Sequence, residues 1–150
     1  NISSLYVARE YLEDVIILDG DQIIYNPDIL SPHFERSGYN CIWTEKCTHE
    51  WLLSVKEGII CSCSRSGGEK GWQLFSVSRW TAEDGQRLKR HLEFEFEEKH
   101  NRQIFWDDIA LFCYPDQYRL GIYEMQSGDI IEIDSLEELV VIDAHYKLKI

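Results

Sequence analysis

Acidic side chains, alone or beside aromatic rings, recur at four places in this sequence. Asp19-Gly20-Asp21 places two carboxylates at positions i and i+2, where a strand end would present both on one face and the glycine would let the backbone turn. Carboxylate oxygens are ligands that Mg²⁺ uses, with water and substrate phosphates completing its coordination. An ordinary turn with solvated acids has the same spacing, so the pattern leaves both interpretations open.

The other three places are Glu50-Trp51, Phe105-Trp106-Asp107-Asp108 and the acidic pair of Glu132-Ile133-Asp134. A pocket for a quaternary ammonium ion needs ring faces and nearby carboxylates, because such a cation has no N–H to donate. The ordinary alternative is that the aromatic residues belong to the core and that Asp107 and Asp108 complement a helix dipole. Five Trp and eight Tyr make such neighbours common by chance, so spacing alone favours the alternative.

Other kinds of catalysis find no support in the sequence. A Gly-x-Ser-x-Gly nucleophile motif is absent, and the glycine-rich residues 66–71 lack the phosphate-loop pattern, so they are interpreted as a hairpin turn. Five cysteines without a Cys-x-x-Cys pair do not make a zinc site. They are expected to be reduced, mostly buried thiols of a cytoplasmic protein.

Composition restricts the class of protein further. The 150 residues carry 15 Lys and Arg against 27 Asp and Glu, a formal net charge of −12. This balance argues against a nucleic-acid partner, because binding a phosphate backbone needs a basic face. A hydrophobic content of 44% is ample for one packed domain. No apolar run approaches the roughly 20 residues that cross a bilayer.

The elements that must position the acidic motifs follow from periodicity. Residues 1–12 have the spacing of an amphipathic helix. Residues 15–18 are an unbroken apolar run, typical of a strand buried on both faces of an α/β sheet. Asp19-Gly20-Asp21 therefore follows the carboxyl end of a strand, where α/β proteins bind ligands. Such a strand needs partners on both edges, and the sequence offers no second run of this kind before it.

The middle of the chain predicts an antiparallel β-meander, and the last third predicts helices and short strands. The meander strands are expected at residues 40–47, 50–57, 58–64 and 72–79, after a short helix near residues 26–32. Thr81 and Asp84 predict a helix N-terminus, and the acidic residues 93–98 of this helix are expected to be solvated. The remaining elements are a short helix at 105–112, two strands at 120–125 and 129–134 that meet at a turn, and a closing helix begun by a capping box of Ser135 and Glu138.

Taken in order, six segments resemble the bacterial CTP:phosphocholine cytidylyltransferases of the nucleotidyltransferase superfamily. The resemblance covers nearly the whole chain. It implies an α/β fold, namely part of a Rossmann-like mixed-sheet nucleotidyltransferase domain with the antiparallel β-meander in its middle. The six segments are NISSL (1–5), LDGDQ (18–22), CTHEWL (47–52), SVSRW (76–80), FWDD (105–108) and IIEIDS (130–135).

The resemblance implies catalytic and metal-binding roles for Asp21 and Asp107, which match the two aspartates that hold Mg²⁺, the implied cofactor. The family also has a glycine-rich, Arg-bearing loop and a Thr-x-x-x-Pro-Lys segment that bind the nucleotide, and neither has a match here. We therefore expect residues 1–150 to be the C-terminal portion of the catalytic domain and to lack turnover alone.

The resemblance also implies a substrate-binding surface. Trp51, Phe105 and Trp106 match the choline-facing surface, and Glu132 and Glu50 balance the charge of the cation. Where the family is expected to have Tyr, this chain has Phe105, which keeps the ring face and loses a hydroxyl.

The implied activity is Mg²⁺-dependent cytidylyl transfer from CTP to phosphocholine, giving CDP-choline and pyrophosphate. Two alternatives stay open. One is a sugar-1-phosphate nucleotidyltransferase of the same superfamily, which would prefer polar hydroxyl partners, and the other is a non-catalytic choline-binding or assembly module. The expected partners are the two small-molecule substrates, with no nucleic acid and no membrane span. An unpaired central strand could favour pairing between chains, so a homo-oligomer is also open.

Overall fold

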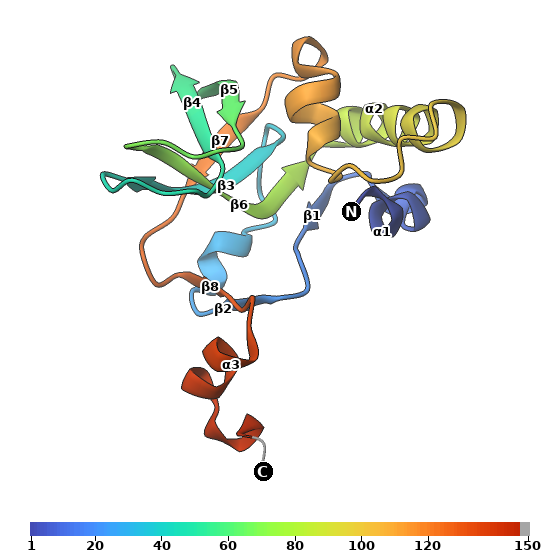
Figure 1. Ribbon diagram of the computed structural model, residues 1–150. Coiled ribbons are helices and arrows are strands. Elements are labelled where there is room, and N and C mark those ends of the chain that lie inside the picture. The colour runs from blue at the N-terminus through green and yellow to red at the C-terminus, as the bar shows by residue number, and fades with distance from the viewer. Residues whose placement is uncertain (148–150) are drawn as a thin grey trace.

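The computed structural model describes residues 1–147 and folds them around a mixed β-sheet (Figure 1). Its strands are β1 (Val15–Ile17), β3 (Gly38–Thr44), β4 (Leu52–Lys56), β5 (Ile59–Ser64), β6 (Gly71–Trp80) and β7 (Gly121–Glu124). They lie in the order β1-β6-β3-β7-β5-β4, and β4 also pairs with β6. β3 and β7 run parallel, whereas the other pairs of this sheet are antiparallel. The predicted α/β class with a mixed sheet is confirmed.

The long strand β6 organises the sheet. Its C-terminal residues pair with β1 and its N-terminal residues with β4, while β3 lies along the other edge. β1 is half-buried and, within the described part of the chain, pairs with β6 alone. The predicted burial of residues 15–18 on both faces is therefore wrong, and Leu18 is 41% exposed. An apolar run reports a preference for burial and carries no information on how many strands will flank it.

The four middle strands form where the sequence predicts them, but their order is not that of a meander. β4 and β5 make an antiparallel hairpin, whereas β3 lies between β6 and β7. The parallel pair of β3 and β7 depends on a close approach of two glycines, since a Cβ at Gly38 would lie 2.3 Å from the carbonyl oxygen of Gly121. Local turn signals do not report such a contact between distant segments.

A second, two-stranded sheet joins two of the acidic motifs. β2 (Gln22–Ile24) follows Asp21, and β8 (Ile130–Glu132) pairs with it in antiparallel fashion, with Gln22 opposite Glu132. The two strands predicted at 120–125 and 129–134 are present as β7 and β8. They do not extend one sheet, because β7 pairs with β3 while β8 pairs with β2.

The helices α1 (Ile2–Val7) and α2 (Ala82–Glu93) pack beside each other at one end of the main sheet (Figure 1). The predicted N-terminal helix is α1 followed by a 3-10 turn. Thr81 caps α2 as predicted, by accepting a hydrogen bond from the amide of Asp84. The other helical segments are 3-10 turns at Arg9–Tyr11, Pro27–Leu30, Pro115–Gln117 and Ala144–Tyr146, π-helical turns at Phe94–Glu98 and Ile109–Cys113, and the α-helix α3 (Leu136–Ile142).

The closing helix α3 begins with the predicted capping box. The Ser135 hydroxyl accepts the amide of Glu138, and the Glu138 carboxylate accepts the amide of Ser135. The helix projects away from the sheets (Figure 1), and Val141 on it is 87% exposed. Among residues 1–147, no helix combines the length and the apolar character that a membrane span requires.

The five cysteines form no disulfide, as expected, but they are not mostly buried. Cys41 is buried, Cys47 and Cys61 are exposed, and Cys63 and Cys113 are intermediate. Burial raises the pKa of the Cys41 and Cys63 thiols to about 12, so both stay protonated at neutral pH.

One acid of the stretch expected to be solvated, residues 93–98, is buried. Glu95 accepts hydrogen bonds from Lys99 Nζ at 2.7 Å, Asn101 Nδ2 at 2.9 Å and the Tyr114 hydroxyl at 2.7 Å. Burial by itself would raise the pKa of the Glu95 carboxyl, but these three donors outweigh it and hold the pKa below its ordinary value. The expectation fails because two of the donors, Asn101 and Tyr114, lie beyond the helix, where helix periodicity does not report a contact.

Candidate functional site

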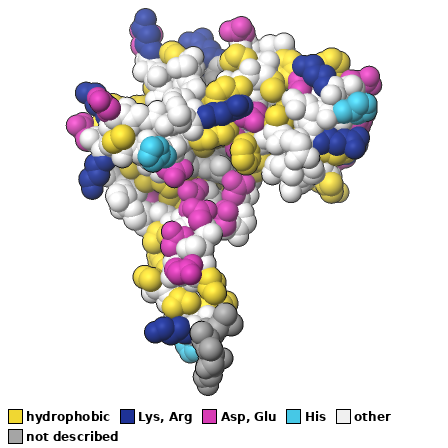
Figure 2. All heavy atoms as spheres, viewed as in Figure 1, with side chains coloured by type: hydrophobic (Ala, Val, Ile, Leu, Met, Phe, Trp, Pro, Cys, Tyr) yellow, Lys and Arg dark blue, Asp and Glu magenta, His cyan; other side chains and the backbone are white. Residues whose placement is uncertain are grey.

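A cavity of about 550 Å³ opens between the two sheets and gathers segments that are far apart in sequence. Figure 2 shows acidic side chains forming a band on one face of the molecule, above α3. A more open depression of about 840 Å³, at residues 32–36 and 121–123, takes in no residue singled out from the sequence. The lining of the 550 Å³ cavity includes all of the predicted site residues: Asp21, Glu50, Trp51, Phe105, Trp106, Asp107 and Glu132.

The Asp-Gly-Asp loop is held against the strand that ends at Glu132. The amide of Ile133 donates to the carbonyl of Asp21 at 2.9 Å, and Gln22 Nε2 donates to Glu132 Oε1 at 3.0 Å. These bonds place Asp21 and Glu132 on the same side of the cavity. Burial raises the pKa of the Glu132 carboxyl, and neighbouring carboxylates, Asp134 first, raise it further.

A tight turn carries Asp107 into the cavity. The amides of Asp108 and Ile109 donate to the carbonyls of Phe105 and Trp106 at 3.2 and 3.1 Å. The Asp108 carboxylate in turn accepts the amide of Phe105 at 3.0 Å. Asp107 and Asp108 are both buried, and they differ in what they face, since Asp107 lines the cavity and Asp108 does not.

Asp107 is a buried carboxyl group with an unmet acceptor. Its Oδ1 has no hydrogen-bond partner among residues 1–147. Burial raises the pKa of Asp107 to about 8; the neighbouring Tyr39 opposes this rise, and the charges of Asp19 and Asp108 add to it. A buried carboxylate oxygen without a partner is costly, so a cation beside Oδ1 of Asp107 would be favoured.

The residues present suit a magnesium ion better than a metal that needs a protein cage. Among the described residues, no three His, Cys, Asp or Glu side chains form a group that could hold a metal. Mg²⁺ often takes one or two protein carboxylates and completes its octahedron with water and substrate phosphates. Asp21 and Asp107 line one cavity, and the unmet Oδ1 of Asp107 is the acceptor that such an ion would satisfy.

Aromatic rings form one wall of the cavity. The Trp51 ring meets Phe105 edge-on at 5.9 Å between centroids and meets Phe112 edge-on at 5.5 Å. Phe105 is 58% exposed, so its ring is available to a ligand. Trp106 is only 6% exposed and stacks on Tyr39, so it touches the cavity while belonging to the core. The interpretation of Trp106 as a core residue is confirmed, and its role toward a ligand stays a prediction.

The charged residues that line the cavity are all acidic. Beyond the four predicted carboxylates, the cavity takes in Asp19 and Asp134, and no lysine or arginine is among its described lining residues. Each of these two lies two positions from a predicted residue, so the i, i+2 spacing of the acids was the signal for them. Asn1 and Ser76 also line the cavity; they begin the segments 1–5 and 76–80 that carry the resemblance, but no site role was predicted for them.

Two curated proteins are similar to this chain over most of its length. It is 28% identical over 148 residues to the 2-aminoethylphosphonate cytidylyltransferase of Lancefieldella rimae, covering 97% of this chain and 60% of that protein. It is 24% identical over 140 residues to the choline-phosphate cytidylyltransferase of Streptococcus pneumoniae, covering 92% of this chain and 59% of that protein. The chain thus spans about 60% of the length of the relatives it matches. No model of a known protein family matches the sequence.

Solved structures agree with the expected fold. The CTP:phosphocholine cytidylyltransferase of S. pneumoniae superposes with a TM-score of 0.84 at 22% identity, over 98% of this chain and 64% of that one. An inositol-1-phosphate CTP transferase from T. maritima superposes with a TM-score of 0.61 at 12% identity, over 100% of this chain and 63% of that one. The nucleotidyltransferase fold and the resemblance to the cytidylyltransferases are confirmed.

Proposed function

We propose that this chain carries the acceptor-binding and metal-binding side of an active site. The site transfers the cytidylyl group of CTP to the phosphate or phosphonate of an acceptor that also carries a cationic amine. The observation that carries the proposal is the cavity, in which six carboxylates and an aromatic wall meet without a lysine or arginine among the described lining residues. Such a site favours a ligand that brings its own positive charge. Because the chain spans about 60% of its relatives, the activity is proposed for the protein to which these residues belong.

The acceptor is proposed to lie between the aromatic wall and the carboxylates. Its ammonium group would contact the ring faces of Trp51 and Phe105, and Glu132 and Glu50 would balance its charge. The half-buried position of Glu132 makes its charge more effective, because water screens it less. We propose phosphocholine as the acceptor, with CDP-choline and pyrophosphate as products.

The chemistry needs positioning more than proton transfer. The second pKa of a phosphate ester is about 6, so the attacking phosphate oxygen is already ionised at neutral pH. It would attack the α-phosphorus of CTP in line, and pyrophosphate would leave. Mg²⁺, which we propose is held by Asp21 and Asp107, supplies neutralisation of phosphate charge when bound. The residues of the cavity hold the acceptor's cation and so orient its phosphate.

A second candidate acceptor is a primary amine such as 2-aminoethylphosphonate. A primary ammonium donates three N–H hydrogen bonds, whereas a quaternary one donates none. Six carboxylates offer many acceptors, and Phe105 supplies a ring without the hydroxyl expected at that position. A sugar phosphate is less favoured, because Asn1 and Ser76 are the neutral polar side chains in the lining.

The test is a substrate panel with the full-length protein. CTP and Mg²⁺ would be combined separately with phosphocholine, phosphoethanolamine, 2-aminoethylphosphonate and glucose 1-phosphate, and pyrophosphate release would be measured. We expect kcat/KM for at least one amine to exceed that for the sugar phosphate by about 100-fold or more, because a sugar leaves the carboxylates without a counter-charge. A preference for the sugar phosphate would contradict the proposal.

A second measurement separates an enzyme from a binding module. Residues 1–150 alone would be titrated with phosphocholine and with Mg²⁺ and CTP in a calorimeter, and tested for CDP-choline formation. We expect acceptor binding without turnover. Robust turnover by this chain would contradict that expectation, and acceptor binding with no turnover by the full-length protein would support the non-catalytic alternative.

A further inference from the structure

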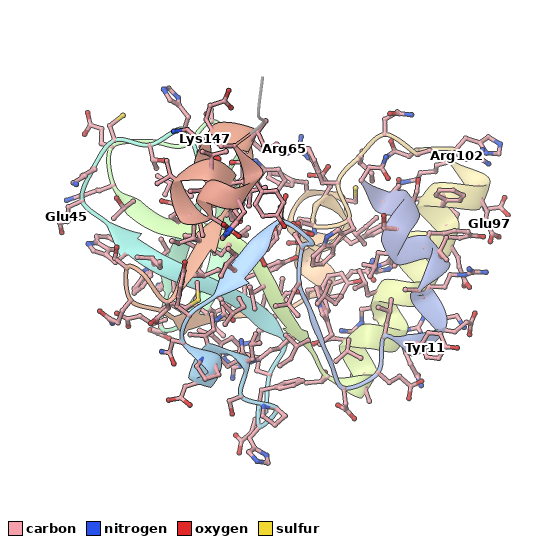
Figure 3. All side chains as sticks on the ribbon, turned by 90° about the horizontal axis from the view of Figure 1, so that it is seen from below. Tyr11, Glu45, Arg65, Glu97, Arg102 and Lys147 are labelled. Carbon is pink, nitrogen blue, oxygen red and sulfur yellow. The ribbon has the colours of Figure 1, made fainter. Side chains whose placement is uncertain are left out.

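Arg65 lies outside the cavity lining and contacts Trp51 of the aromatic wall together with Phe112, which packs edge-on against Trp51. It is on the loop that follows β5, and its guanidinium carbon is 3.9 Å from the ring centroid of Phe112 and 5.6 Å from that of Trp51. Seen from below, it is on the sheet side of the molecule, away from Glu97 and Arg102 at the end formed by α1 and α2 (Figure 3). No sequence pattern pointed to this residue.

Arg65 also holds the turn that carries Phe105 and Asp107. Its Nη2 pairs with Oδ1 of Asp108, whose side chain is 4% exposed. The second oxygen of Asp108 accepts the amide of Phe105 at 3.0 Å. Arg65 is therefore connected to the cavity by two routes, through the Trp51 ring and through the Asp108 carboxylate.

Only an arginine can contact the rings and pair with the Asp108 carboxylate at the same time. Its guanidinium is planar, so one face can stack on rings while the N–H groups at its edge bind a carboxylate. A lysine could supply charge to Asp108 but would lose the planar contact with Phe112. Without any cation at position 65, the buried Asp108 carboxylate would keep only its bond to Phe105 among the described hydrogen bonds.

We propose that Arg65 is a positioning residue that sets the specificity of this site for cationic acceptors. It packs against Trp51 and Phe112 and fixes the backbone of Phe105, so the angle and separation of the two cavity rings depend on it. The strength of a cation–π contact depends on where the cation sits over the ring. Arg65 thereby acts on the acceptor without touching it. The inference rests on the proposed function and deepens it.

The test compares Arg65→Ala, Arg65→Lys and the control Arg119→Ala in the full-length protein, with steady-state kinetics for the amine acceptor and for CTP. Arg119 is an exposed arginine outside the cavity. We expect Arg65→Ala to raise the acceptor KM by about 10-fold or more and to change the CTP KM by less than about 2-fold, since supporting residues around a site typically contribute this much. Arg65→Lys should fall between wild type and Arg65→Ala, and Arg119→Ala should match wild type.

The outcomes separate this inference from the proposed function. An active wild type whose acceptor KM is unchanged in both Arg65 variants would overturn the inference alone, as would an equal rise in both KM values. A wild type that uses no cationic acceptor would overturn the proposed function and the inference with it. Where Arg65→Ala does not fold, Arg65→Lys decides the matter, because it keeps the charge beside Asp108 and loses the stacking.

Discussion

The amide of Ile133 donates a hydrogen bond to the carbonyl oxygen of Asp21 at 2.9 Å. This bond, with the side-chain bond of Gln22 to Glu132, joins segments 110 residues apart in sequence. The two bonds together place Asp21, which we propose binds the metal, and Glu132, which we propose faces the acceptor, on one side of the cavity. The acceptor's cation and its phosphate would thus be held by adjacent parts of one small sheet.

Replacing either proposed metal ligand should abolish activity without unfolding the protein. For Asp21→Asn and Asp107→Asn in the full-length protein, we expect kcat to fall by about 100-fold or more, because a charge facing the reacting phosphates is lost. Asp107→Asn should also keep or raise the melting temperature, because it replaces a buried ionisable group by a neutral amide of the same shape. Pyrophosphate release and thermal unfolding check the two effects, with exposed Asp116→Asn as control. Retained turnover in both variants would refute the metal assignment.

The aromatic wall should contribute to acceptor affinity. Trp51→Leu is expected to raise the acceptor KM by about 2- to 30-fold, which corresponds to a cation–π contact of about 0.5–2 kcal/mol. The CTP KM should change little. Trp43→Leu is a matched control, because Trp43 is also a partly exposed tryptophan but lies on β3 outside the cavity lining. Equal effects of the two substitutions would show that the loss is one of general packing.

The buried Glu95 should make stability depend on pH. Its pKa is lowered in the folded state, so its contribution is present above the ordinary carboxyl pKa and is lost as pH falls through the lowered value. Glu95→Gln should therefore destabilise the protein by about 1–3 kcal/mol at neutral pH, through loss of charge-assisted hydrogen bonds. Melting temperatures of wild type and variant should differ at neutral pH and converge as the pH falls below the ordinary carboxyl pKa and through the lowered one. Exposed Glu98→Gln is the control, and a constant difference over the same fall in pH would contradict the argument.

Replacing Gly85 in α2 by alanine should destabilise the protein, although helix propensity favours alanine. In an exposed helix, Gly→Ala would stabilise by about 1 kcal/mol. Gly85 is buried, and a Cβ there would lie 1.7 Å from the carbonyl oxygen of Leu12. Gly85→Ala should instead destabilise by about 1–3 kcal/mol, because the contact is with backbone that cannot move aside cheaply. Denaturant unfolding checks the sign, with exposed Arg90→Ala on the same helix as control.

Much of the local structure could be predicted from short stretches of sequence. The caps at Thr81 and Ser135 were correct, because each depends on a side chain and an amide only three residues apart. The middle strands were correct, because side-chain alternation and turn residues are local. Their mostly antiparallel pairing was correct too, but their order was not, since the neighbours of β3 depend on two glycines that meet across the sheet.

The candidate site shows the same division. Its residue types and the grouping of its acids came from the sequence and from the resemblance that the ordered motifs carry, and the structure gathers all seven residues around one cavity. The role proposed for Arg65 came only with the structure, whereas Asp19 and Asp134 already belonged to the acidic motifs of the sequence. Arg65 has no motif, because its contacts with Phe112 and Asp108 are made by folding alone.

Asp107 and Asp108 illustrate most clearly what the sequence determines and what only the tertiary structure determines. The sequence by itself determined that two carboxylates stand together after two aromatic residues. Only the tertiary structure decided that Asp108 pairs with Arg65 while Asp107 faces a cavity with an unmet oxygen. The physical reason is that charge partners and burial are supplied by segments distant in sequence, whereas turns and caps are supplied by neighbours.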